Sequence, residues 1–112
     1  MSIITKRENG KKKINQYILV KDIGKGSFGK VKLVLDTNKS NRPCAMKILS
    51  KRKLSKIFVG KSRTALNDVM QEIAIMKKLD HSNIVKLYEV LDDPTVDKLY
   101  IIMEYVKNGS LL

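Results

Sequence analysis

The chain has 112 residues, of which 43% are hydrophobic and 5% aromatic, and its formal net charge is +12. This length suits one small domain with a core, and no apolar run approaches the 18 residues of a membrane-spanning helix. Met1–Glu8 lacks the apolar stretch of a signal peptide, and the single cysteine cannot form an internal disulfide. We therefore expect a cytoplasmic or nuclear protein without a membrane span.

The positive charge is unevenly distributed along the chain. Residues 1–61 hold 17 Lys and Arg against 3 Asp and Glu, whereas residues 62–112 hold 6 against 8. A basic half can bind nucleic acid or another anionic surface. Few aromatic residues lie among these cations and no nucleic-acid motif accompanies them, so we predict no nucleic-acid partner. The simplest interpretation is a solvated basic face, and the alternative is a docking surface for an acidic partner or a missing segment.

The order of patterns along the chain predicts a tail followed by one domain. Residues 1–15, which include Lys6-Arg7 and Lys11–Lys13, are expected to be a flexible basic tail, and residues 16–112 the domain. Alternating or continuous apolar residues predict five strands. These strands are expected over 17–23, 30–36, 43–49, 84–91 and 99–104.

One main helix is predicted between the third and fourth strands. It should begin at Thr64 or Asp68 and end at Leu79, because apolar residues recur at helical spacing in this stretch. Asp68 with Gln71 resembles a capping box. The basic linker before the helix, residues 50–63, contains the apolar triplet Ile57–Val59 and has no clear pattern.

The most informative stretch is Ile23–Val31, in which Gly24, Gly26 and Gly29 have the spacing G-x-G-x-x-G. Glycine has no Cβ, so the backbone amides of such a stretch can approach a bulky anion closely. Three phosphate-binding designs share this spacing. The residues around it must therefore decide among them.

Two of the three designs fail on residues that carry chemistry. A dinucleotide-binding fold needs a helix after the glycines and an acidic residue about 20 positions later. Here residues 30–36 alternate as a strand, and residues 37–67 contain no acidic residue. A P-loop needs a hydroxyl after its lysine to hold magnesium. Val31 follows Lys30 and provides none.

The third design is a glycine-rich hairpin that covers the phosphates of ATP, as in protein kinases. It requires a valine two residues after the last glycine, a lysine on the third strand and a glutamate on a helix. Val31, Lys47 and Glu72 meet these requirements in order. From about Tyr17 onward, the chain resembles the N-terminal lobe of a eukaryotic protein kinase. The resemblance implies an α+β fold with a five-stranded antiparallel sheet and one main regulatory helix.

The resemblance implies ATP as the cofactor. Lys47, positioned by Glu72, would reach the α- and β-phosphates, and movement of the helix would break this catalytic pair. Met103 matches the gatekeeper, and main-chain groups of Glu104 and Val106 match the hinge that binds adenine. The implied nucleotide-binding residues are Ile23, Gly24, Lys25, Gly26, Ser27, Phe28, Gly29, Val31, Ala45, Lys47, Met103, Glu104, Val106 and Ser110.

Three further residues can be interpreted in the same way. Met76 and Leu87 match the two upper members of the apolar spine of the family. His81 is the only histidine and has no second ligand at metal spacing, so we interpret it as structural. No metal site is predicted in this chain, because in a kinase Mg²⁺ is held by the C-terminal lobe.

Several longer stretches resemble one family, the calcium/calmodulin-dependent protein kinase kinases. They are Ile14–Tyr17, Asp22–Gly26, Leu49–Leu54, Gln71–His81 and Val85–Pro94. That family phosphorylates serine or threonine, so the resemblance implies protein substrates, typically downstream kinases, and calmodulin as a partner through a segment that this chain lacks. Family members carry a long Arg/Pro-rich insert between the lysine and the helix. Here Lys47 and Glu72 are only 25 positions apart with no proline between them.

The family's catalytic aspartate and magnesium ligands belong to a C-terminal lobe that this sequence does not contain. We therefore expect the chain to be inactive by itself, as part of an active serine/threonine kinase. The alternative is a stand-alone lobe that acts as a non-catalytic regulatory or binding module, and a third interpretation is a basic nucleic-acid binder. Exposed apolar residues of the cleft, Val31, Ala45, Met76 and Leu87, predict self-association.

Overall fold

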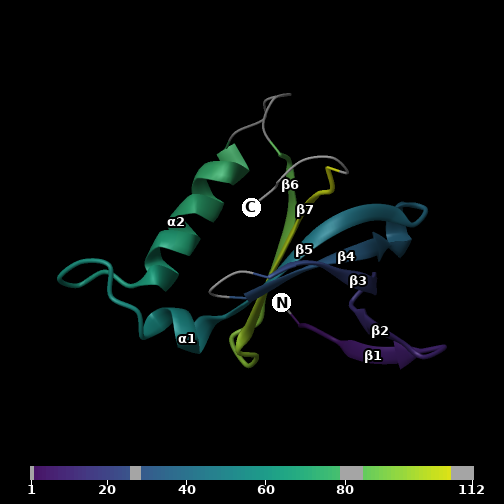
Figure 1. The fold of residues 1–112 in the computed structure, drawn as a ribbon, viewed down its shortest axis with the longest axis horizontal. Helices are drawn as coiled ribbons and strands as arrows, with labels where there is room; N and C mark the ends of the chain where they lie inside the picture. The colour runs from purple at the N-terminus through teal and green to yellow at the C-terminus, as the bar shows by residue number, and fades with distance from the viewer. Residues whose placement is uncertain (1, 26–28, 79–84, 107–112) are drawn as a thin grey trace.

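The computed structural model describes residues 2–25, 29–78 and 85–106 (Figure 1). These residues form a curled antiparallel sheet with one main helix on one side, which confirms the predicted α+β fold. The sheet has seven strands instead of the predicted five, in the order β1-β2-β3-β4-β5-β7-β6. The strands are β1 (Thr5–Glu8), β2 (Lys11–Ile14), β3 (Tyr17–Lys25), β4 (Gly29–Asp36), β5 (Arg42–Ser50), β6 (Leu87–Asp92) and β7 (Lys98–Glu104).

The helical elements are the short α1 (Lys51–Ser55), the main helix α2 (Ala65–Lys78) and one 3₁₀ turn, η1 (Thr37–Lys39). None of the helices in the described ranges is long and apolar enough to cross a membrane. The five predicted strands correspond to β3 through β7, and their ends differ from the prediction by at most three residues. The predicted helix corresponds to α2, which begins at Ala65.

The two additional strands come from the segment that we expected to be a flexible tail. Thr5–Glu8 and Lys11–Ile14 form a hairpin that also pairs with β3, so this expectation differs from the structure. Asn9 and Gly10 have φ values of 52° and 80°, as the two central residues of a type I′ turn require. Ile14 is fully buried, which anchors the hairpin to the rest of the sheet. The five cations of this segment conceal the alternation that a strand would otherwise show.

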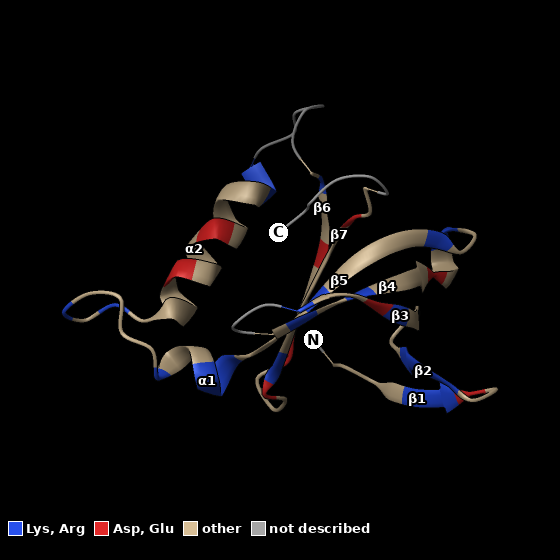
Figure 2. Ribbon diagram, in the orientation of Figure 1, with Lys and Arg blue, Asp and Glu red and all other residues tan. Residues whose placement is uncertain are grey.

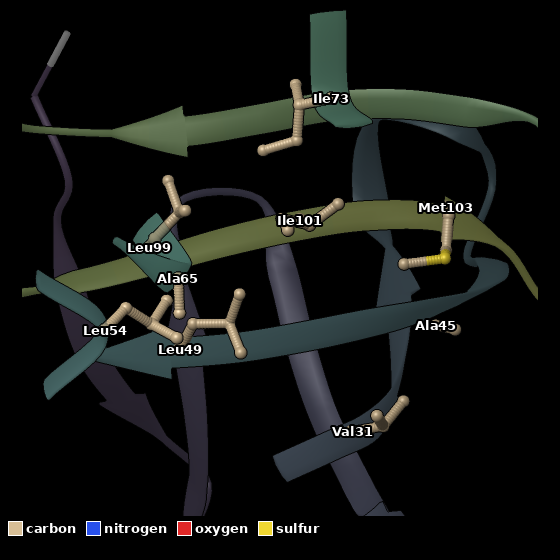
Figure 3. Packing of buried hydrophobic residues seen from close by; sticks show 9 residues of the cluster. All are labelled: Val31, Ala45, Leu49, Leu54, Ala65, Ile73, Leu99, Ile101 and Met103. Carbon is tan, nitrogen blue, oxygen red and sulfur yellow. The ribbon is translucent and has the colours of Figure 1, made fainter. Parts of the chain in front are cut away.

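The sheet separates two apolar clusters because successive side chains of a strand point to opposite faces. One cluster lies between the sheet and the helices, and Figure 3 shows its members. They are Val31, Ala45, Leu49, Leu54, Ala65, Ile73, Leu99, Ile101 and Met103. The second cluster lies inside the curl of the sheet and comprises Ile14, Tyr17, Val34, Cys44, Met46, Leu91, Tyr100 and Ile102. Burial raises the pKa of the Cys44 thiol, which keeps this side chain a small unreactive hydrophobe.

The short helix α1 follows β5 directly and was not predicted. Ser50 caps its N-terminus by accepting a hydrogen bond from Lys53 N, at 3.2 Å. The Ser50 hydroxyl also donates to Asp97 Oδ2, at 2.6 Å, and this bond contributes most to lowering the pKa of Asp97. Leu54 is fully buried and fixes α1 against the sheet. A single leucine among basic and polar residues is too little to show a helical period in the sequence.

The N-terminus of α2 is capped by residues other than those predicted. Thr64 N donates to Asn67 Oδ1, at 2.9 Å, and Asn67 N donates to Thr64 Oγ1, at 3.3 Å. This reciprocal pair is a capping box in which asparagine takes the position of the usual Glu or Gln. Asp68 instead forms an ion pair with Arg63, at 3.0 Å. The predicted Asp68–Gln71 box was therefore placed four residues too late.

Candidate nucleotide-binding site

Three neighbouring strands bring the predicted adenine-binding residues onto one face of the sheet. Val31 of β4 is paired with Lys47 of β5, and Ala45 of β5 is paired with Met103 of β7. Directly paired residues project to the same face of a sheet. Ala45 and Lys47 are two positions apart in β5, so their side chains also share one face. Val31, Ala45 and Met103 are 8%, 0% and 4% exposed. Figure 3 shows these three side chains along one face of the strands. This face therefore combines three buried apolar side chains with the half-buried Lys47.

The strands that flank the glycine-rich turn remain paired up to the turn itself. Gly24 is paired with Val31 and Lys25 with Lys30, while a register shift occurs between Asp22 and Gly24. Ile23 is half-buried against the cluster beneath the helices, and Lys25 is exposed. Gly26, Ser27 and Phe28, which the sequence placed over the phosphates, lie outside the described residues.

The two described glycines of the turn differ in what the fold requires of them. A Cβ added to Gly29 would lie 1.9 Å from the carbonyl oxygen of Ile48. This is a backbone atom of the adjacent strand, so β4 and β5 could not pair closely with any larger residue there. A Cβ added to Gly24 would meet only the Val31 side chain, at 3.6 Å, which is ordinary van der Waals contact. Folding therefore explains the glycine at position 29 and leaves the one at position 24 unexplained.

Lys47 and Glu72 form no ion pair within 4.0 Å, although both belong to the described part of the chain. Lys47 is half-buried on the sheet face that α2 covers, whereas Glu72 is exposed. The next residue, Ile73, contacts the cluster on that face and is 4% exposed. The rotation of α2 that buries Ile73 thus leaves Glu72 in solvent. The sequence identified both residues, and the pair that it predicted is not formed in this structure.

The apolar face of α2 differs in part from the prediction. Leu66 and Val69 pack against the cluster around Ile73, as does Leu87 of β6. Met76, the other predicted spine residue, is half-buried and is not part of either cluster. Leu54 of α1 is a buried member of the same cluster that sequence reasoning did not identify. Its only signal was a leucine within a basic linker.

The predicted hinge follows the last pair of β6 and β7. Glu104 N donates to the carbonyl oxygen of Lys86, at 2.8 Å, so this N–H group is already engaged within the lobe. A nucleotide can therefore use only the carbonyl group of Glu104, which is the group that the resemblance assigns to adenine binding. Val106 is 37% exposed. Ser110, one of the implied nucleotide-binding residues, and His81, which we interpreted as structural, lie outside the described residues.

Comparison with known proteins matches residues 17–112 to the protein kinase domain. The chain belongs to the protein kinase family. The matched residues correspond to the N-terminal lobe of the domain, with the curled antiparallel sheet and single main helix described above. The hairpin formed by β1 and β2 precedes the matched region.

Curated relatives of this kinase lobe are serine/threonine kinases. A probable serine/threonine-protein kinase of Dictyostelium discoideum is 45% identical over 96% of the chain, which covers 15% of that protein. The serine/threonine-protein kinase GRIK2 of Arabidopsis thaliana is 48% identical over 88% of the chain, covering 24% of that protein. A calcium/calmodulin-dependent protein kinase kinase of Caenorhabditis elegans is 40% identical over 99% of the chain, covering 23% of that protein. The kinase lobe therefore spans at most about a quarter of the length of these relatives.

Proposed function

We propose that this chain is the ATP-binding lobe of a serine/threonine protein kinase that transfers the γ-phosphate of ATP to protein substrates. One observation carries the proposal, which is the position of Lys47 on the same sheet face as Val31, Ala45 and Met103. An apolar face suits a planar base, and an ammonium group beside it suits the phosphates attached to that base. Kinase catalysis depends mainly on such positioning and charge stabilisation, because the transferred phosphoryl group needs little covalent chemistry from the protein.

We assign distinct roles to the residues around this face. Val31 and Ala45 would cover adenine, with Met103 at the back of the site and the hinge carbonyl of Glu104 at the edge of the base. The glycine-rich stretch from Ile23 to Gly29 would cover the phosphates. Support for a ligand role at Gly24 comes from its surroundings, since the fold accommodates a Cβ there. Mg²⁺ would be held by residues of a C-terminal lobe, as the family resemblance implies.

The separation of Lys47 from Glu72 supports a role for α2 as a regulatory element. A carboxylate beside Lys47 would hold the ammonium group toward the phosphates, and Glu72 is the α2 residue that matches this role. In this structure Glu72 is exposed and unpaired with Lys47, both residues being described. We propose that α2 turns or moves toward the sheet when the kinase becomes active, which forms the pair.

The relatives also support a narrower proposal about substrates. The name of the C. elegans relative describes a kinase that acts on another protein kinase. We propose that serine or threonine residues of downstream kinases are the substrates, with calmodulin as a regulator through a segment outside this chain and a cytoplasmic or nuclear location. A non-catalytic regulatory module remains the alternative function, and in that case Lys47 would be dispensable.

The experiment that tests the proposal compares two lysines of adjacent strands. Lys47→Met removes the ammonium group on the nucleotide face, and Lys30→Met removes an exposed one on the opposite face, where its partner is Ile48. Phosphotransfer from ATP to a protein substrate is measured with the full-length protein. We expect a loss of at least about 100-fold for Lys47→Met, because transition-state charge stabilisation is the main catalytic contribution in such sites. Equal activities of the two variants would contradict the proposal.

A further inference from the structure

The hairpin of β1 and β2 concentrates positive charge at the edge of the sheet. Figure 2 shows the blue segments of both strands at one end of the fold, away from α2. The hairpin carries Lys6, Arg7, Lys11, Lys12 and Lys13 against a single acidic residue, Glu8. Glu8 is 3.8 Å from Lys13, which partly neutralises one face of the hairpin. Arg7 and Lys12 form the cationic pair of the other face, and neither has an acidic partner within 4.0 Å among the described residues.

The register of the hairpin places like charges directly opposite each other. Arg7 is paired with Lys12, and Lys6 is paired with Lys13. Like charges in directly opposed positions destabilise a strand pair. The sequence nevertheless keeps both pairs, and the hairpin is held by the turn at Asn9-Gly10 and by buried Ile14. An anionic ligand would remove this repulsion.

Protection of the sheet edge is a simpler explanation for the cations of the hairpin, but it explains only part of their arrangement. Lysines on an edge prevent a sheet from pairing with other copies of itself. This accounts for the cations of β1, which is the last strand of the sheet. It does not account for Lys13, because β2 is paired there on both sides, with Lys6 of β1 and Ile18 of β3. Lys11 and Lys12 pair with β1 alone, so edge protection extends to them, but it does not explain why Arg7 and Lys12 lie directly opposite each other.

The outer edge of β1 has main-chain groups available for pairing. Asn15 N donates to Ile4 O, at 2.9 Å, so Ile4 faces β2. Main-chain groups of successive residues in an antiparallel pair alternate in direction, which turns those of Thr5 and Arg7 toward the open edge. No strand pairs with this edge among the described residues. The phosphates of a lipid surface or a nucleic acid could use the charge and accept from the N–H groups, whereas a polypeptide strand matches both the donors and the acceptors of this edge.

We propose that the open edge of β1 binds an extended segment of a partner protein that carries acidic residues at alternate positions. The segment pairs with the main chain of Thr5 and Arg7, and its carboxylates lie on the face of Arg7 and Lys12. Alternate spacing is required because every second side chain of a strand points to the same face. Strand addition of this kind takes affinity from the main chain and specificity from alternate side chains. The proposal does not depend on nucleotide binding.

The test measures binding of a fluorescent octapeptide of alternating Glu and Thr to the 112-residue chain by anisotropy. We expect it to bind at least about tenfold more tightly than the matched Gln–Thr peptide, because charge complementarity favours the acidic segment. The double variant R7Q/K12Q should lose this preference. The control K77Q/K78Q removes the same charge from the exposed end of α2 and should retain it. Absence of any preference for the acidic peptide would overturn the proposal.

A second experiment distinguishes binding by strand pairing from binding by charge attraction alone. Thr5→Pro removes a main-chain donor that faces the open edge, and proline is tolerated on edge strands and at their first residue. Thr5→Val changes the side chain and keeps the donor. Relative to Thr5→Val, Thr5→Pro should weaken peptide binding about 3- to 10-fold, the effect of one hydrogen bond. An octapeptide with alternate amides N-methylated tests the same point on the unaltered chain and should bind more weakly.

Two outcomes of this second experiment would overturn the proposal. One is equal affinity of the proline and valine variants together with undiminished binding of the N-methylated peptide, which would make the hairpin a general polyanion surface. The other is tighter binding of phosphatidylserine vesicles or duplex DNA than of the acidic peptide at the same salt concentration. If Thr5→Pro fails to fold, as judged by circular dichroism, the N-methylated peptide alone decides.

Discussion

At the scale of single residues, the two described glycines of the turn illustrate how a motif combines separate requirements. Gly29 is needed because a Cβ at this position would collide with the carbonyl oxygen of Ile48 in the neighbouring strand. Gly24 has space for a methyl group, so its value must come from outside the fold, and the approach of a phosphate to the main chain is the reason that we propose. The same spacing in sequence thus serves packing at one position and, in our proposal, ligand binding at another.

This difference predicts that alanine substitutions at the two glycines affect different properties. Gly29→Ala should lower the free energy of unfolding by about 1–3 kcal/mol, the usual cost of overpacking, because the strands must separate to admit the Cβ. Gly24→Ala should leave unfolding nearly unchanged and weaken nucleotide binding. Urea denaturation of both variants measures the first effect, and titration with ATP measures the second. Unfolding midpoints that fall equally in the two variants would contradict this account.

At the scale of elements, the N-terminal hairpin is an integral part of the sheet. Its Ile14 lies in the cluster inside the curl together with Tyr17, whose hydroxyl bonds Glu89 of β6. Burial, followed by this bond to a carboxylate, raises the pKa of Tyr17 and keeps it neutral. Ile3 N also donates to Asp93 Oδ2, at 3.1 Å, just after β6. Contacts from both ends of the hairpin therefore close one side of the curled sheet.

The contribution of the hairpin to stability can be tested at two isoleucines, Ile4 just before β1 and Ile14 at the end of β2. Ile14→Ala should lower the free energy of unfolding by about 2–5 kcal/mol, because a fully buried side chain leaves a cavity. Ile4→Ala is the control, since Ile4 is 57% exposed and should change stability by less than about 0.5 kcal/mol. Chemical denaturation followed by circular dichroism distinguishes the two. A flexible tail would make both substitutions neutral.

At the scale of the whole molecule, exposed apolar side chains and a high net charge have opposite effects on self-association. Phe58 is 69% exposed, and its neighbours Ile57 and Val59 are 37% and 44% exposed. A patch of this kind favours association. The net charge of +12 repels other copies of the chain, and salt screens that repulsion. The sequence led us to expect self-association through cleft residues that include Val31 and Ala45, but these two are only 8% and 0% exposed. Association should instead involve the exposed side chains around Phe58, and it should depend on ionic strength.

We predict that the chain is monomeric at low salt and associates as salt is added. Light scattering should give a mass near 12.8 kDa in dilute buffer and a larger mass at about 1 M salt, where the screening length falls to about 3 Å. Phe58→Ser should move the onset of association to higher protein concentration without changing the net charge. A single mass at all salt concentrations would show that the exposed patch is too small to drive association.

Local sequence patterns were sufficient to predict most of the elements and which candidate site residues share a sheet face. Alternation predicted that Ala45 and Lys47 share a face with Val31, and the pairing confirms this, whereas Met103 was assigned through the kinase resemblance. The hairpin of β1 and β2 was missed although Asn9-Gly10 is a strong turn signal. In β2, Ile14 is the only apolar residue, so no alternation of apolar and polar residues is visible. A run of cations is typical of a flexible tail. The turn signal was present in the sequence, but the run of cations led us to predict a tail.

Local periodicity and residue type were sufficient to predict strands β3 to β7, the glycine spacing, the candidate lysine and glutamate, and the family to which they point. Only the tertiary structure decided which helix residues face the sheet. Val69 and Ile73 do so, whereas Met76 is half-buried and Glu72 is exposed. A helix of period 3.6 leaves its rotation undetermined within a broad apolar stripe, and packing against β7 and α1 selects one rotation. That choice sets the distance between Lys47 and Glu72.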